Sequence, residues 1–160
     1  MFKLVSWSLL YLLPFQALAG LELVATYQDW EHYESPSLDT GKAVVLGVAN
    51  SKGSISSNMV ALRCTTEGVN LLFFKSLPNE QLGYMAQAYL DDGNAFTMDV
   101  WVKGRTHWAT VPDQKTSQFL DAERLTVTLS GDDNQTEQVE VSLRGFESMY
   151  HKLLPSCEEE

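Results

Sequence analysis

Apolar and polar residues alternate in several short stretches of the chain from residue 43 onward. Val60, Leu62 and Cys64 share one side of such a stretch, and more polar or smaller neighbours share the other. A period of two is typical of a half-buried β-strand. Similar stretches predict further strands over 43–50, 69–75, 95–102, 106–111, 125–129 and 139–143. The stretch 84–90 fits either a helix or a strand, and its alternation favours a strand.

Turn residues separate the predicted strands. Glu67-Gly68 lies between two of them and predicts a hairpin over 58–75, and Lys103-Gly104-Arg105 predicts a second hairpin. Polar and aromatic residues over 28–36 suggest a short strand or an irregular lead-in. A helical turn is expected over 116–122.

The hydrophobic period changes near the C-terminus. After Gly145, apolar residues recur at helical spacing, and Pro155 is expected to end the helix. Many short strands followed by one helix are typical of a mainly β domain. We expect an antiparallel β-sandwich or a barrel-like sheet with a short C-terminal helix, whose apolar face covers a face of the sheet or the mouth of the barrel.

The first 19 residues resemble a secretory leader. Lys3 is a positive n-region, Leu4 to Leu13 form an apolar segment of about ten residues, and Ala17-Leu18-Ala19 is a small-residue cleavage site. The apolar segment is too short to span a bilayer. We expect a signal peptide over 1–19, one β-rich domain over 20–160, and a location in the periplasm or outside the cell, with no stable membrane anchor after cleavage.

The chain is acidic, with a net charge of −10, and loss of Lys3 with the leader makes it more negative. Such a chain repels nucleic acid and anionic lipid. The charge is therefore interpreted as a solubilising surface or as a docking face for a basic partner.

Cys64 and Cys157 are the only two cysteines, and both lie outside the leader. In an exported protein, such a pair predicts a disulfide. The closed loop would contain about 93 residues, for which loop entropy gives about 4–5 kcal/mol.

Other patterns give weak signals for chemistry. His32, His107 and His151 are far apart on unlike elements, whereas zinc needs three or four ligands at characteristic spacing. A G-x-S-x-G motif is absent from the sequence. The Asp91-Asp92-Gly93 and Gly131-Asp132-Asp133-Asn134 stretches fit turns better than calcium loops or acid–base pairs. We therefore expect no catalytic residue, metal or cofactor.

Aromatic residues provide the most informative candidate site. Trp101 and Trp108 flank the turn at Gly104, where they can pack across strands. Trp30, Tyr33 and both of these tryptophans belong either to the core or to an exposed patch. Tryptophan and arginine are common interface anchors, so the predicted partner-binding residues are Trp101, Lys103, Arg105, His107 and Trp108.

The order of several residues resembles the VasI-type periplasmic proteins associated with type VI secretion. The resemblance covers residues 30–157 and depends on Trp30, Ser35-Pro36 and Asp39, Leu62-Arg63-Cys64 with Leu71-Leu72-Phe73, Asp91-Asp92-Gly93 with Trp108, Phe119-Leu120 with Ala122 and Leu125, and Leu143-Arg144-Gly145-Phe146 with Cys157. It implies an exported accessory protein with a β-rich domain and no established catalytic activity.

Three functions are compatible with these observations. The first is a periplasmic accessory or binding protein that acts through protein–protein contacts. The second is an inhibitor or immunity-type protein of a cell-wall hydrolase, because an acidic protein suits a basic target. The third is a hydrolase with an unfamiliar site, which would need carboxylates that converge in a cleft.

Overall fold

A computed structural model of the chain describes residues 20–36, 43–50, 59–74, 77 and 79–157. The predicted signal peptide over 1–19 lies outside the described residues. The described part forms a ten-stranded antiparallel sheet and two α-helices, which confirms the predicted mainly β fold with a C-terminal helix. The strands and helices are β1 Glu22–Tyr27, β2 Trp30–Pro36, β3 Ala43–Ala49, β4 Met59–Thr65, β5 Gly68–Phe74, β6 Gly83–Leu90, β7 Phe96–Lys103, β8 Thr106–Thr110, α1 Thr116–Asp121, β9 Arg124–Ser130, β10 Thr136–Ser142 and α2 Phe146–Cys157.

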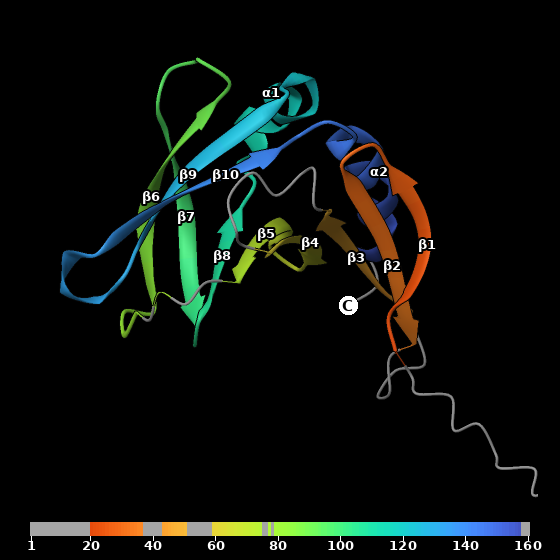
Figure 1. Ribbon diagram of the computed structural model, residues 1–160, viewed down its shortest axis with the longest axis horizontal. Helices are drawn as coiled ribbons and strands as arrows, with labels where there is room; N and C mark the ends of the chain where they lie inside the picture. Colours follow the sequence, from red (N-terminus) through yellow and green to blue (C-terminus); the bar gives the residue numbers. More distant parts are fainter. Residues whose placement is uncertain (1–19, 37–42, 51–58, 75–76, 78, 158–160) are drawn as a thin grey trace, which may run out of the picture.

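The sheet is curved and open. Its strand order is β1-β2-β3-β4-β5-β8-β7-β6-β9-β10, so β1 and β10 are the two edges and the sheet does not close into a barrel. In Figure 1, β9 and β10 run diagonally past β6 and β7 on the left, while β1 and β2 stand on the right beside α2. The backbone N–H of Asp29 donates to the carbonyl of Arg144 at 3.2 Å, which links the β1–β2 turn to the segment after β10.

The core lies between the two ends of the curved sheet. α2 packs on the inner face against β2, β3, β4 and β5. Strands contribute alternate residues to this core because successive side chains point to opposite faces. The largest fully buried apolar side chains are Trp30, Phe73, Phe119, Phe146, Leu62, Leu71, Met98, Leu125, Leu129, Met149 and Leu153.

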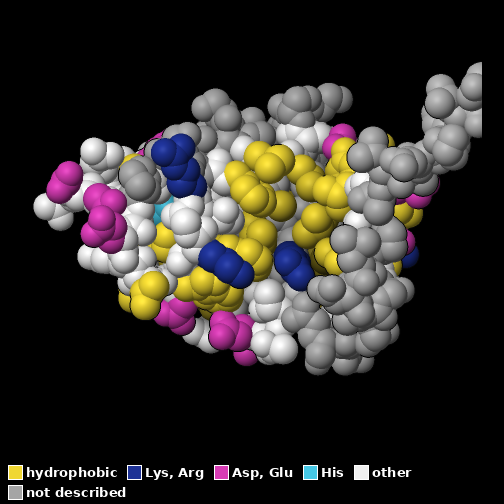
Figure 2. Space-filling model, turned by 90° about the horizontal axis from the view of Figure 1, so that it is seen from below, with side chains coloured by type: hydrophobic (Ala, Val, Ile, Leu, Met, Phe, Trp, Pro, Cys, Tyr) yellow, Lys and Arg dark blue, Asp and Glu magenta, His cyan; other side chains and the backbone are white. Residues whose placement is uncertain are grey.

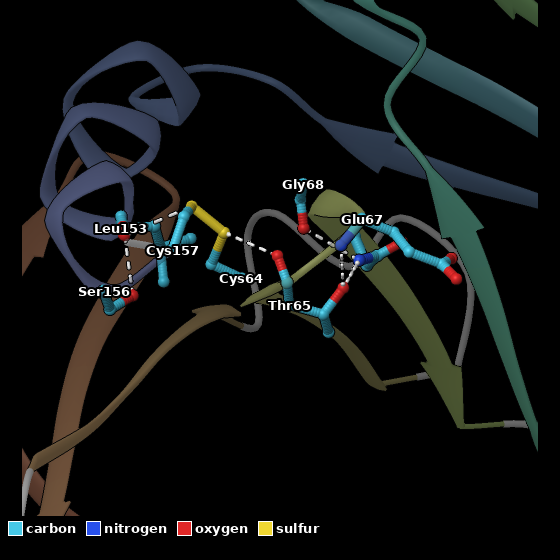
Figure 3. The surroundings of a disulfide bond; sticks show 8 residues. Cys64, Thr65, Glu67, Gly68, Leu153, Ser156 and Cys157 are labelled. Carbon is cyan, nitrogen blue, oxygen red and sulfur yellow. Dashed lines mark hydrogen bonds between the residues drawn. A yellow bond between two sulfur atoms is a disulfide. The ribbon is translucent and has the colours of Figure 1, made fainter. Parts of the chain in front are cut away.

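The predicted disulfide between Cys64 and Cys157 is present, and it joins β4 to the last turn of α2 (Figure 3). The expectation that Pro155 ends the helix is wrong, because α2 continues to Cys157 with Pro155 inside it. Two contacts hold this last turn. The Ser156 hydroxyl donates to the Leu153 carbonyl at 2.6 Å, and the disulfide ties the next residue to the sheet.

Several predicted boundaries agree with the structure. The 84–90 stretch is a strand, and the 28–36 stretch contains a strand from Trp30 onward. The helical turn over 116–122 is α1. The sequence pattern does not predict strand β1, whose residues are exposed or only partly buried. No helix in the described part of the chain is long and apolar enough to cross a membrane.

Candidate functional site

Two tryptophans stack on the outer face of the sheet, the face turned away from α2. Trp101 in β7 lies directly opposite Trp108 in β8, and Trp108 lies opposite Leu72 in β5. The two indole rings are nearly parallel, with centroids 5.9 Å apart and an interplanar angle of 14°. The predicted cross-strand packing of these tryptophans is therefore confirmed, and both side chains remain partly exposed.

Further apolar side chains extend this surface over the neighbouring strands. Phe74 in β5 pairs with Met59 in β4, and these side chains are 39% and 51% exposed. Seen from below, the molecule has hydrophobic side chains gathered in the middle of its face, close to Lys and Arg side chains (Figure 2). We call the following set the outer patch: Met59, Phe74, Trp101 and Trp108. Ala61 and Leu72 lie on the same face of the sheet, but their side chains are buried.

Two exposed cations stand at one end of the outer patch. Lys103 pairs with Thr106 across the β7–β8 hairpin, and Thr106 pairs in turn with Phe74. Arg105 lies in the turn itself, where Gly104 has a φ of +65°, a conformation that favours glycine. The turn therefore holds two positive charges next to apolar surface, in a chain whose net charge is −10.

The prediction that His107 belongs to this surface is wrong. Its side chain is fully buried, because it points to the inner face while its neighbour Trp108 points to the outer face. Nε2 of His107 lies 3.0 Å from the carbonyl oxygen of Leu77, and Nδ1 lies 2.9 Å from Oη of Tyr84. A carbonyl can only accept, so Nε2 carries the proton and Nδ1 accepts from the tyrosine.

The same network continues into β9. The backbone N–H of Ser130 donates to Oη of Tyr84 at 3.1 Å. Oη thus accepts from one strand while its O–H donates to a histidine on another. The network connects β8, β6 and β9 inside the sheet, so His107 has a structural role.

Removal of the Tyr84 hydroxyl is expected to destabilise the protein. Tyr84→Phe leaves Nδ1 of His107 and the N–H of Ser130 without these partners, for a loss of about 1–3 kcal/mol in the free energy of unfolding. Urea denaturation measures the difference. Tyr89→Phe is the matched control, because the Tyr89 hydroxyl makes no hydrogen bond to the described residues. Equal stability of the two variants would contradict the role given to Tyr84.

Burial raises the pKa of the Tyr84 phenol above its ordinary value of 10.0, and the hydrogen bond from Ser130 partly opposes this effect. A raised pKa means that the folded state holds the proton more tightly than the unfolded state. The resulting stabilisation is complete below about pH 10 and is lost as pH rises through the folded-state pKa. We expect the urea midpoint to fall above about pH 10 more steeply in the wild type than in Tyr84→Phe. Parallel curves would contradict this expectation.

Two buried polar atoms on or near the outer face have no hydrogen-bond partner among the described residues. They are Nε1 of Trp108 and Oδ1 of Asn70. The amide nitrogen of Asn70, by contrast, donates to the Thr65 hydroxyl and the Gly68 carbonyl, both at 2.9 Å. An unpaired buried polar atom costs about 1–3 kcal/mol. The indole N–H of Trp108 therefore contributes no stabilising hydrogen bond.

The remaining aromatic and histidine candidates do not form one site, because they lie in different parts of the fold. Trp30 belongs to the core, and Tyr33 donates its hydroxyl hydrogen to Glu31 at 2.8 Å. His32 is buried in β2, whereas His151 is exposed on α2. Within the described residues, no group of three or more His, Cys, Asp or Glu side chains is placed to hold a metal ion.

The acidic stretch at Asp91 forms a turn, as predicted. Oδ1 of Asp91 accepts from the backbone N–H of Arg124 at 2.9 Å and from that of Glu123 at 3.2 Å. The N–H of Asp91 donates back to the carbonyl of Arg124 at 2.9 Å. This carboxylate therefore connects the end of β6 to the start of β9.

A shallow polar depression of about 450 Å³ lies next to this turn. Its buried carboxylate, Asp29, accepts from the Ser142 hydroxyl at 2.8 Å. The carboxylate of Asp91 accepts hydrogen bonds from the backbone N–H groups of Glu123 and Arg124. The depression is lined by Asp29, Asp91, Asp92, Glu123, Arg124, Ser142 and Arg144.

Comparison with known proteins supports the fold. No protein-family model matches the chain, and no curated protein sequence matches it. The chain is similar to the crystal structure of invasion associated protein B from Bartonella henselae, with a TM-score of 0.56 and 14% sequence identity, over 86% of this chain and 100% of that one. At this identity the likeness concerns the fold alone.

Proposed function

We propose that this protein is an exported periplasmic accessory protein that binds a protein partner through the outer patch. The observation that carries the proposal is the stacked pair Trp101 and Trp108, continued by the exposed Phe74 and Met59 on one face of the sheet. Tryptophan and other aromatic residues are enriched at interface hot spots. An exposed apolar surface with polar neighbours is typical of a protein-binding site.

The positive charges beside the outer patch indicate what kind of surface the partner presents. Lys103 and Arg105 stand beside the patch, so the partner would place apolar side chains over the tryptophans and acidic side chains against the turn. The Cys64–Cys157 disulfide is compatible with an oxidising compartment. The resemblance to VasI-type proteins suggests that the partner belongs to a type VI secretion apparatus.

Site-specific photocrosslinking in the native host tests this proposal. A benzophenone amino acid replaces Phe74 on the outer patch, and in a control protein it replaces Gln138 on β10. We expect a discrete crosslinked product from position 74 and none of the same mass from position 138. Crosslinking with the reverse preference, or with neither position, would contradict the proposal.

Charge reversal then tests which residues attract the partner. The double variant Lys103→Glu and Arg105→Glu is expected to abolish the crosslink from position 74, because both side chains are exposed next to the patch. Lys152→Glu, on the exposed side of α2, is the control and is expected to leave the crosslink unchanged. Both variants alter exposed side chains, so stability is expected to change by only about 0.5 kcal/mol or less.

Inhibition of a cell-wall hydrolase is the second candidate, favoured by the net charge of −10. An acidic inhibitor is steered electrostatically to a basic enzyme. Turbidity assays of wall lysis with a basic lysozyme test it directly. Inhibition that persists in the Lys103→Glu and Arg105→Glu variant would favour this function over binding through the outer patch.

A further inference from the structure

The two edges of the sheet differ in chemistry. β10 carries Glu137, Gln138 and Glu140 along its length, and charged residues commonly protect an edge strand from pairing with another chain. β1 instead exposes consecutive apolar residues, since Leu23 and Val24 are each 51% accessible. No strand among the described residues pairs with the side of β1 that faces away from β2.

From this contrast, we propose that the free edge of β1 binds an extended segment of a partner protein in which apolar and basic residues alternate. The segment would add a strand to the sheet beside β1, through backbone hydrogen bonds. In Figure 1, β1 is the outermost strand of the sheet at the end where α2 lies. β1 and β10 are the two edges in the strand order, and β2 and β3 separate β1 from the strands that carry the outer patch, so this site does not depend on the proposed function.

Apolar side chains of β1 provide the first part of the recognition. Leu23 and Val24 follow Leu21, which is 52% exposed, so three apolar residues within four positions lie at an open edge. Neighbouring strands place side chains about 4.5–5.5 Å apart, close enough for direct apolar contact with an added strand. The register between β1 and β2 shifts between Leu23 and Ala25. This bulge divides the edge, so the added strand is expected to be short.

Charge provides the second part of the recognition. β1 and β2 carry Glu22, Glu31 and Glu34, and residues 20–36 contain no Lys or Arg. Glu22 and Glu34 are directly opposite each other in the ladder, and Oε1 of Glu34 lies 3.1 Å from Nε2 of His32. Adjacent like charges are unfavourable in a sheet, and a basic residue on an added strand would relieve this repulsion. A second copy of this acidic chain would increase it.

A peptide that alternates Val and Lys over nine residues, with capped ends, is the probe. We expect it to bind the mature protein and to slow amide hydrogen exchange within residues 22–27 by at least about tenfold, with affinity that falls as salt is added. The same peptide with Glu in place of Lys should not bind. A version methylated at alternate backbone nitrogens should not bind either, because it keeps the side chains but cannot form the ladder.

Variants at one position of β1 separate charge from packing. Val24→Lys is expected to weaken binding by at least about tenfold through like-charge repulsion, whereas Val24→Glu keeps binding. Gln138→Lys on the opposite edge is the matched control and keeps wild-type affinity. Circular dichroism and the urea midpoint establish that each variant is folded.

Three results would overturn the inference. One is equal affinity of the Val24→Lys and Val24→Glu variants, and another is exchange protection at β10 or the outer patch in place of β1. The third is a dimer in sedimentation equilibrium that Val24→Lys dissociates, since it would make a second copy the occupant. None of these results affects crosslinking from position 74, so failure here and failure of the proposed function are distinguishable.

Discussion

Loss of the disulfide is expected to destabilise the protein by about 4–5 kcal/mol in the double variant Cys64→Ala and Cys157→Ala, the value that loop entropy gives for a separation of 93 residues. Most small domains have a total stability of about 5–15 kcal/mol. The loss would therefore remove a large part of the folding free energy. Guanidinium denaturation of the wild type and the double variant measures it.

The structural consequence is expected at the end of α2. Pro155 has no N–H to donate within the helix, so the turn that contains it depends on the Ser156 hydroxyl and on the bond to β4. Without the disulfide, amide hydrogen exchange at 153–157 should become faster by a larger factor than exchange in β4. Ser156→Ala is the control and should produce only part of this change. An unchanged denaturation midpoint, or free thiols in protein purified from its native compartment, would contradict the role of the disulfide.

The strands could be predicted because most of them are buried on one face, which imposes a period of two. β1 could not, because its residues are exposed or only partly buried along the whole strand and show no clear alternation. It is an edge strand, and its position depends on pairing with β2. The helix end was misplaced because a tertiary constraint, the bond at Cys157, extends the helix beyond Pro155.

In the candidate site too, local sequence patterns predict some features, whereas others depend on tertiary pairing. The Trp101–Trp108 stack followed from the position of the two residues around the turn at Gly104. His107 was wrongly assigned to the same surface, although adjacent residues in a strand point to opposite faces and Trp108 already occupies the outer one. The contribution of Phe74 could not be predicted, since it arises from the pairing of β5 with β8, which are far apart in the sequence.

Substitution of Trp30 is expected to cause the second large loss of stability, because this residue joins the start of β2 to the end of β10 and to α2. Its fully buried ring packs edge-on against Phe146 of α2, with centroids 5.8 Å apart and an angle of 71°. Its Nε1–H donates to the carbonyl of Ser142 at the end of β10, at 3.0 Å. A single side chain thus holds the start of β2 against the last strand and the last helix.

Trp30→Ala should lower the free energy of unfolding by about 3–5 kcal/mol, as expected when a buried tryptophan is removed from a packed core. Trp30→Phe keeps part of the packing but loses the donor to Ser142, so an intermediate loss of about 1–3 kcal/mol is expected. Trp108→Phe is the matched control. The indole N–H of Trp108 has no acceptor in the part of the chain that the structure describes, so the change should be smaller than for Trp30→Phe. Urea denaturation gives all three values. A loss at Trp108 equal to that at Trp30 would show that the contact with β10 contributes little, and that the two ends of the sheet are held together by other means.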